Sequence, residues 1–193
     1  SFGPGVKTVA EGDKVVLHWR KGIGIESEPP IYRLNGEKIN AGWVTTFNEY
    51  AIVSENRLTT IPNNSELDVA SLFGCAVTTG FGVIENNAKL KIGQSVVVYG
   101  AGGIGLNIIQ AASLKSAYPI IAIDIHENRL ELAKKIGATH TINTKEFTIS
   151  EISNQISSIA KIDYFIDNTG NPVIIELGYK LLKSNGKIIL VGV

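Results

Sequence analysis

A glycine-rich stretch in the second half of the chain has the residue types and the spacing that bind a diphosphate. Val96–Tyr99 is a β-branched and aromatic run that predicts a buried parallel strand, and Gly100, Gly102 and Gly105 follow it. The first glycine permits a sharp turn, the second lets the backbone approach the phosphates, and the third lets a helix pack close to the strand. A helix over 104–115 would then present unpaired N–H groups and its positive dipole end to the anion.

An acidic residue stands where the second half of the same motif requires one. The apolar run Ile120–Ile123 ends in Asp124, about 20 residues after the last glycine, where a carboxylate binds ribose hydroxyls. A carboxylate at this point also repels a 2′-phosphate, which favours NAD over NADP. The simpler alternative is a glycine-rich turn in an ordinary βαβ unit, with Asp124 only ending a strand and capping the next turn.

The composition describes a soluble globular protein. Lys and Arg together number 18, as do Asp and Glu, so the formal net charge is zero and nothing indicates nucleic acid or an anionic membrane as a partner. No apolar run approaches the ~18 residues of a membrane span. Cys75 is the single cysteine, which excludes a disulfide framework and favours the cytoplasm.

In the second half of the chain, strand patterns and helix patterns alternate. This alternation predicts an α/β fold with a Rossmann-like, doubly wound parallel sheet. Two helix starts are marked, because Thr148 and Glu151 have capping-box spacing and the Asn-Pro pair at 171–172 is typical of an N-terminus. We expect Asn185 and Gly186 to end the last helix. The predicted strands cover residues 96–99, 120–124, 139–143, 163–168 and 187–193.

The first sixty residues predict part of an antiparallel β domain. Val15–Leu17 predicts a short strand, 21–40 is rich in turn signals, and 42–53 alternates apolar and polar residues again. A linking helical segment follows, and capping-box spacing between Ser65 and Asp68 predicts its start. The predicted domains are residues 1–60, 61–93 and 94–193.

Several passages are similar to zinc-type medium-chain alcohol and polyol dehydrogenases. The passages that carry this resemblance are Gly5–Val15, Gly74–Gly82, Val96–Leu106, Ala122–Ala138, Asp167–Pro172 and Ile189–Val193. The resemblance implies a β-rich GroES-like catalytic domain, present here in part, before the Rossmann-like domain. The chain has no methionine and starts and stops abruptly, so we expect it to be part of a longer protein.

The resemblance also implies roles for particular residues. Cys75 matches the third catalytic zinc ligand, and Thr79 matches a threonine that packs against the nicotinamide. Asp124 matches the ribose-binding acid, and Arg129 a basic residue near the adenosine ribose. The remaining predicted cofactor-binding residues are Gly100, Gly102, Gly103, Ile104 and Gly105 in the diphosphate loop, and Thr169, Val191 and Val193 around the nicotinamide.

Each of the less specific residues also has a simpler reading. A lone cysteine among small apolar residues is often an inert buried side chain, and Arg129 could pair only with Glu131 or with solvent. The family's other zinc ligands precede the segment that matches Gly5–Val15, and this sequence does not contain that preceding stretch. We therefore expect no dehydrogenase turnover from this chain alone. The four cysteines of a structural zinc lobe are missing from 21–40, which predicts no structural zinc.

These observations favour an NAD- and zinc-dependent oxidoreductase that interconverts an alcohol or polyol and its aldehyde or ketone. Two alternatives remain open: a zinc-free member of the quinone- or enoyl-reducing type, and a non-catalytic NAD-binding module that senses redox state. The expected partner is a small alcohol or carbonyl substrate. We also expect a homo-oligomer, either a dimer or a tetramer, because an open edge strand can pair with another copy.

Overall fold

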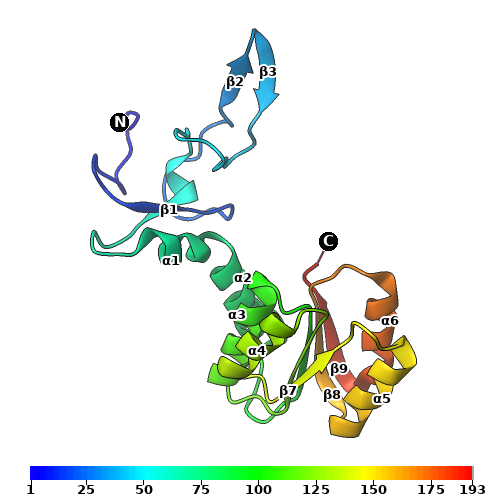
Figure 1. The fold of residues 1–193 in the computed structure, drawn as a ribbon. Helices are drawn as coiled ribbons and strands as arrows, with labels where there is room; N and C mark the ends of the chain where they lie inside the picture. Colours follow the sequence, from blue (N-terminus) through cyan, green and yellow to red (C-terminus); the bar gives the residue numbers. More distant parts are fainter. Residues whose placement is uncertain (193) are drawn as a thin grey trace. The chain divides into compact units, whose positions relative to one another are not determined.

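The computed structural model describes residues 1–192 and divides into two compact units. These units are Ser1–Cys75 and Ala76–Val193, and each is described by itself (Figure 1). The boundary between them falls within the segment that the sequence marks as a helical link.

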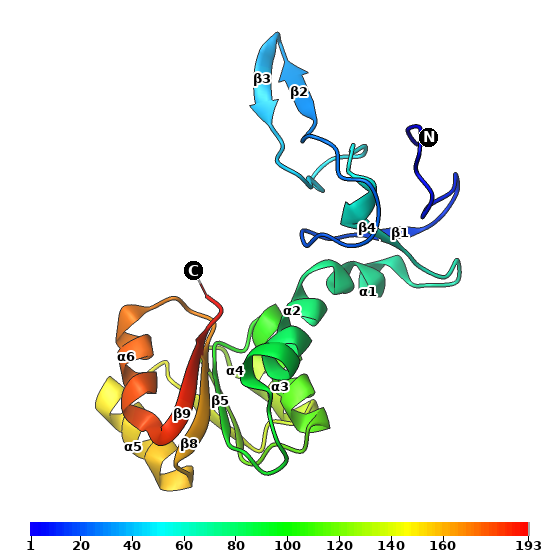
Figure 2. The same ribbon diagram turned by 180° about the vertical axis from the view of Figure 1, so that it is seen from behind.

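The first unit contains two small antiparallel pairs of strands. β1 (Val15–Leu17) pairs with β4 (Leu58–Thr60), and β2 (Ile31–Leu34) pairs with β3 (Glu37–Asn40). The second pair is a hairpin whose two turn residues, Asn35 and Gly36, both have positive φ, as a two-residue turn of this kind requires (Figure 2). The other elements of this unit are short helices: η1 (Glu55–Arg57), α1 (Leu67–Ser71) and η2 (Leu72–Gly74).

The alternating pattern over 42–53 does not form a strand, contrary to the prediction. The ring of Trp43 lies 5.0 Å from the Arg57 guanidinium, which also lies over Trp19 at 5.7 Å. Phe47 and Tyr50 are exposed. The aromatic side chain that is covered therefore packs on a buried cation instead of on a neighbouring strand.

The predicted start of the helical link is also wrong. α1 begins at Leu67, its N-cap is Glu66, and no side chain of residues 1–192 caps it. Ser65 instead donates its backbone N–H to the Pro62 carbonyl, in a turn that delays the helix.

The second unit is the predicted α/β domain with a five-stranded parallel sheet. Its sheet order is β7-β6-β5-β8-β9, so the chain builds outward from β5 in one direction and then returns to β5's other side. Such a reversal leaves a crevice at the carboxyl ends of the strands. The elements in chain order are α2 (Ala76–Gly82), η3 (Val83–Ala88), β5 (Val96–Tyr99), α3 (Gly103–Leu114), β6 (Ile120–Asp124), α4 (Glu127–Lys135), β7 (His140–Asn143), α5 (Ile149–Ile159), β8 (Ile162–Asp167), α6 (Pro172–Leu181) and β9 (Leu182–Leu190).

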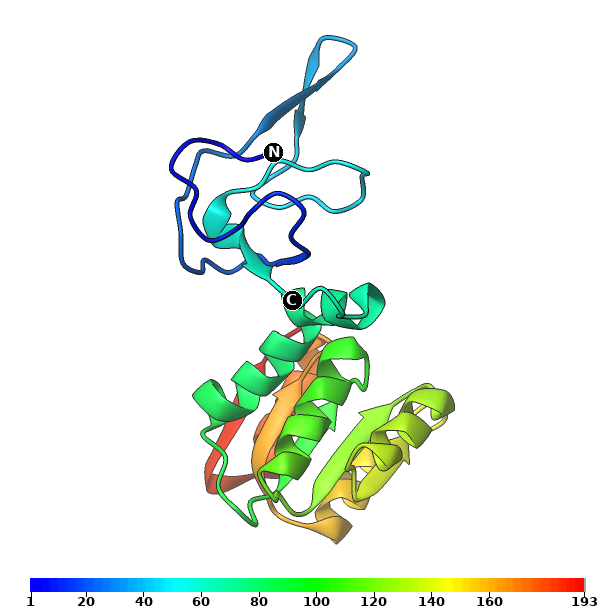
Figure 3. The ribbon, with the colours of Figure 1, turned by 90° about the vertical axis from the view of Figure 1, so that its left-hand side faces the viewer.

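Helices cover both faces of this sheet, which explains the unbroken apolar runs of its strands. Val96 and Val98 point into one core, with Ile108 of α3 and Leu130 of α4. The alternate residues of β5 point into the other core, whose helices are α5 and α6. Figure 1 shows these two helices on the face opposite α3, and Figure 3 views α2 and α3 in front of the sheet. A strand buried on both faces has no polar side to show.

Two predicted helix starts are confirmed and one predicted helix end is wrong. Thr148 and Glu151 form the capping box of α5, and Asn171 caps α6. However, α6 ends at Leu181, and 182–190 is already strand. The pairing of β9 with β8 is irregular between Ile162 and Tyr164, and this irregularity places the Asn-Gly pair inside the strand.

Within residues 1–192, no single helix has both the length and the apolar composition of a membrane span. The bent pair Leu67–Gly74 and Ala76–Ala88 meets both measures only when its two helices are counted together.

Candidate dinucleotide-binding site

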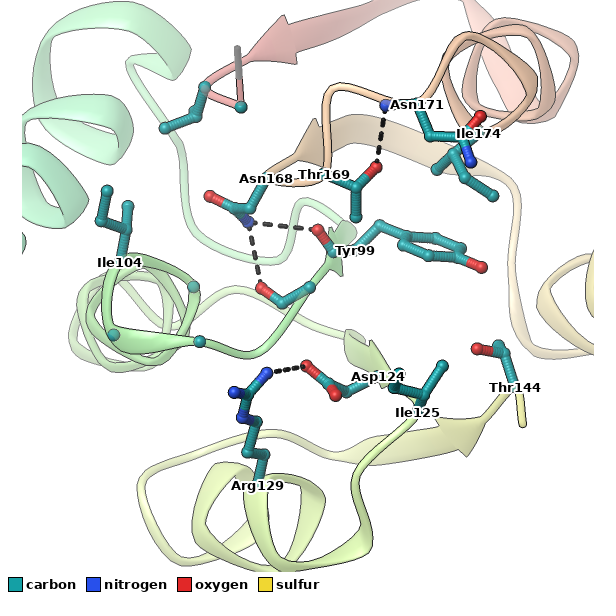
Figure 4. Close-up of a pocket in the computed structure, with 16 residues that line it drawn as sticks. Tyr99, Ile104, Asp124, Ile125, Arg129, Thr144, Asn168, Thr169, Asn171 and Ile174 are labelled. Carbon is teal, nitrogen blue, oxygen red and sulfur yellow. Dashed lines mark hydrogen bonds and ion pairs between the residues drawn. The ribbon is translucent and has the colours of Figure 1, made fainter.

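A cavity of about 680 Å³ lies at the carboxyl end of the parallel sheet. It brings together nine of the ten predicted cofactor-binding residues (Figure 4). The tenth, Val193, lies outside the described residues. The nine that line the cavity are Gly100, Gly102, Gly103, Ile104, Gly105, Asp124, Arg129, Thr169 and Val191.

The glycine loop begins at the end of β5 and leads directly into α3. Gly100 has φ +90°, a conformation that other residues rarely adopt. A Cβ on Gly105 would overlap the Gly100 carbonyl oxygen, so the first turn of α3 can lie against the loop only with a glycine there. A Cβ on Gly102 or Gly103 would meet nothing within 4 Å, which shows that this side of the loop is open.

The N-terminus of α3 faces this open side. Its N-cap is Gly102, and no side chain of the described residues caps it. The first amides of a helix lack intrahelical partners, so they are available to an anion in the cavity.

Asp124 is buried at the end of β6 and holds the loop in place. One carboxylate oxygen, Oδ2, accepts the backbone N–H of Ala101 at 2.8 Å, and Oδ1 accepts that of His126 at 2.9 Å. Arg129 Nη1 lies 3.5 Å from Oδ2, so this arginine pairs with Asp124 and not with Glu131 (Figure 4). A carboxylate has about four acceptor positions, which leaves capacity for a ligand hydroxyl.

The opposite wall is a turn that Asp167 organises at the end of β8. Its buried carboxylate accepts the backbone N–H groups of Thr169 and Gly170 at 3.1 and 2.9 Å, and the Thr169 hydroxyl at 2.6 Å. The Asp167 carbonyl also accepts the N–H of Val191, at 2.8 Å. These bonds fix Thr169 and Val191 beside the cavity.

Seven residues that line the cavity were not predicted from the sequence as site residues. They are Tyr99, Ile125, Thr144, Asn168, Asn171, Ile174 and Gly192. Several of them immediately follow a strand or end it, so the rule that sites form at the carboxyl ends of parallel strands could have found them. Burial, with Asp167 and Asp124 nearby, raises the pKa of the Tyr99 hydroxyl, although Thr144 acts in the other direction. The hydroxyl therefore stays protonated at neutral pH.

Neither residue with a predicted catalytic role lines this cavity. Cys75 belongs to the first unit and is exposed, so the reading of an inert buried thiol does not hold. Thr79 lies half-buried on α2. No three His, Cys, Asp or Glu side chains among residues 1–192 come together as a metal site. The described residues therefore do not by themselves provide the ligand set of the zinc that the resemblance implies.

The second unit has a Rossmann-like fold with a cavity at the carboxyl ends of its strands, and comparisons with known proteins narrow this class. Residues 103–193 match the family described as zinc-binding dehydrogenase. The chain is 35% identical over 156 residues to S-(hydroxymethyl)glutathione dehydrogenase of Paracoccus denitrificans, covering 77% of this chain and 42% of that protein. For the Saccharomyces cerevisiae enzyme of the same name, the identity is 34% over 180 residues, covering 90% and 46%.

Solved structures agree with this assignment. Benzyl alcohol dehydrogenase from Acinetobacter calcoaceticus matches with a TM-score of 0.67 and 36% identity, over 72% of this chain and 38% of that one. An alcohol dehydrogenase zinc-binding domain protein from Burkholderia ambifaria matches with a TM-score of 0.66 and 34% identity, over the same shares. The chain is therefore similar, in sequence and in fold, to zinc-type alcohol dehydrogenases. It spans less than half the length of these curated relatives.

Proposed function

We propose that the cavity of the second unit binds NAD, and that the protein acts as an NAD-dependent dehydrogenase that interconverts an alcohol or polyol and its carbonyl compound. The observation that carries this proposal is that the open glycine loop and the buried carboxylate of Asp124 line one cavity. The curated relatives named above are dehydrogenases, which supports the reaction class.

The residues of the cavity suit successive parts of the dinucleotide. The amides at the start of α3 face the side where Gly102 and Gly103 are open, which suits a diphosphate. Asp124, beside Arg129, suits the hydroxyls of the adenosine ribose. Thr169 and Val191 lie at the opposite wall, where we place the nicotinamide. Bound NAD supplies the hydride acceptor, and the residues of this chain hold and orient it.

Titration of this chain with NADH, followed by the fluorescence of the cofactor, tests the proposal. We expect binding of NADH and much weaker binding of NADPH, because Asp124 repels a 2′-phosphate. Asp124→Asn should weaken NADH binding about 10-fold or more, since hydrogen bonds to a charged group contribute about 1.5–3 kcal/mol each. The same variant should narrow the gap between NADH and NADPH.

The matched control is Glu131→Gln, which removes a carboxylate from the exposed side of α4 without touching the cavity. Affinity for NADH should be unchanged in this variant. Equal binding of NADH and NADPH by the wild-type chain, or no response to NADH at all, would contradict the proposal.

Cys75 stays a predicted zinc ligand, and its partners are expected outside this sequence. The wider predictions of a homo-oligomer and a cytoplasmic location also stay predictions. Metal analysis of the whole protein with Cys75→Ser tests the predicted role of Cys75 as a zinc ligand. Retention of stoichiometric zinc by this variant would remove the thiolate from the ligand set, whereas we expect the zinc to be lost.

A further inference from the structure

One peptide group of the glycine loop is held from both sides by side chains of neighbouring strands. Its N–H, on Ala101, donates to Asp124 at 2.8 Å. Its carbonyl, on Gly100, accepts a hydrogen bond of 3.2 Å from Asn168 Nδ2. The same nitrogen donates to the Tyr99 carbonyl at 3.3 Å (Figure 4). Asp124 ends β6 and Asn168 follows β8, so the two strands that flank β5 together fix the orientation of this peptide.

The contact with Asn168 is close because the surrounding backbone is closely packed. A Cβ on Gly100 would lie 3.2 Å from Asn168 Cβ, and one on Gly192 would lie 2.6 Å from the Asn168 carbonyl carbon. The Asn168 side chain therefore sits where the glycine loop, the turn after β8 and the end of β9 meet.

The other half of the Asn168 amide has no partner in the described part of the chain. Oδ1 is shielded from solvent and accepts no hydrogen bond. Exchange of the two amide atoms would not solve this, because Nδ2 already donates to two carbonyls that cannot bond to an oxygen. A buried acceptor without a donor is costly and calls for an explanation.

The direction in which Oδ1 points explains why this acceptor has no partner within the protein. In Figure 4 this oxygen points toward Ile104 and away from Asp124 and Arg129. Asn168 and Ile104 both line the cavity. Because Asp124 and Arg129 mark the end assigned to the adenosine ribose, Oδ1 points into the half of the site beyond the diphosphate.

We propose that Asn168 is a positioning residue of the dinucleotide site with a separate task for each half of its amide. Nδ2 holds the Gly100–Ala101 peptide so that the loop keeps its open side to the diphosphate. Oδ1 accepts a hydrogen bond from the nicotinamide half of the ligand, either from a ribose hydroxyl or from the carboxamide N–H. This inference rests on the proposed binding of NAD.

The test uses ligands that grow in steps. ADP carries the adenosine and the diphosphate, ADP-ribose adds the second ribose, and NAD⁺ adds the nicotinamide. Calorimetric titration of each ligand into this chain is compared with Asn168→Leu, which removes both halves of the amide, and with Asn168→Ala, which removes them with a smaller side chain. Asn154→Leu, at an exposed position of α5, is the matched control.

We expect Asn168→Leu to weaken ADP binding about 3- to 10-fold through the loop, and to weaken a longer ligand by a further 3- to 10-fold, as one lost neutral hydrogen bond implies. The further loss begins with ADP-ribose if the ribose is the donor, and with NAD⁺ if the carboxamide is. Asn168→Ala should show the same pattern, because it also removes both halves of the amide. The control should bind like the wild type.

Equal losses for all three ligands in Asn168→Leu would show that Oδ1 has no contact with the ligand and would overturn the proposal. Unchanged binding of every ligand would overturn both tasks. If Asn168→Leu does not fold, as judged by circular dichroism, Asn168→Ala decides by the same comparison: a further loss with a longer ligand supports the proposal, and equal losses for all three ligands overturn it. Failure of the wild-type chain to bind any of the three ligands would instead contradict the proposed function.

Discussion

At the scale of single residues, the glycines of the loop serve two different purposes. Gly105 is buried, and a Cβ there would overlap the Gly100 carbonyl oxygen, so it is needed for packing. Gly103 is exposed to the cavity, and a Cβ there would meet nothing within 4 Å. One glycine thus allows the helix to approach the loop, and the other keeps the space in front of the loop clear.

This difference predicts different outcomes when each of these two glycines is replaced by alanine. Gly105→Ala should lower the free energy of unfolding by about 1–3 kcal/mol, the usual result of overpacking. Gly103→Ala should change that energy by less than about 1 kcal/mol, because alanine suits a helix. It should nevertheless weaken NADH binding, since the methyl group occupies the cavity. Denaturant unfolding and NADH titration of both variants check this, and normal NADH affinity in Gly103→Ala would contradict the placement of the diphosphate.

At the scale of elements, the short helix η1 joins separate segments of the first unit. The Glu55 carboxylate accepts the backbone N–H groups of Lys7, Thr8 and Ile25 at 2.6–2.8 Å. These bonds lower the pKa of Glu55 from 4.5 to about 2, and the bond from the Lys7 N–H has the largest effect. A carboxylate that serves three amides in this way replaces regular strand pairing as the link between these segments.

The lowered pKa predicts an acid-sensitive first unit. Because the folded-state pKa of Glu55 lies below its unfolded value, the stabilisation is complete above about pH 4.5, and it is lost as the pH falls toward about 2. Both tryptophans, Trp19 and Trp43, belong to this unit and lie over Arg57, so their fluorescence reports on it. Urea unfolding followed by this signal should show the loss between these pH values.

Glu55→Gln is the variant that isolates this effect. It should be less stable than the wild type at neutral pH and should show a shallower dependence of stability on pH in this range. A wild-type chain and a Glu55→Gln variant with parallel pH dependence would show that another group causes the acid sensitivity.

At the scale of the whole molecule, the proposed ligand should stabilise the unit that contains the cavity. A ligand at 100 times its Kd stabilises the folded state by about 2.7 kcal/mol, which slows hydrogen exchange through unfolding about 100-fold. We expect this protection by NADH in the amides of β5, β6 and α3. The β2–β3 hairpin of the first unit serves as the internal comparison. Protection confined to the hairpin would contradict a site at the glycine loop.

Much of the α/β unit was predictable because its signals are local. Val96–Tyr99 and Ile120–Ile123 are apolar on both faces, Thr148 and Glu151 form a capping box, and the glycine spacing identifies the loop. The first unit was less predictable. Its segments are joined by side-chain contacts, such as those of Arg57 and Glu55, and such contacts leave no periodic pattern in the sequence.

The sequence by itself determined the order of strands and helices in the second unit, the position of the diphosphate loop and the acid on the next strand. Each of these depends on residues that are neighbours in the chain or that repeat at a helical or strand period. Only the tertiary structure placed Asn168 against the Gly100–Ala101 peptide and left its oxygen without a partner. These residues are far apart in the chain, and the parallel pairing of β5 with β8 brings them together.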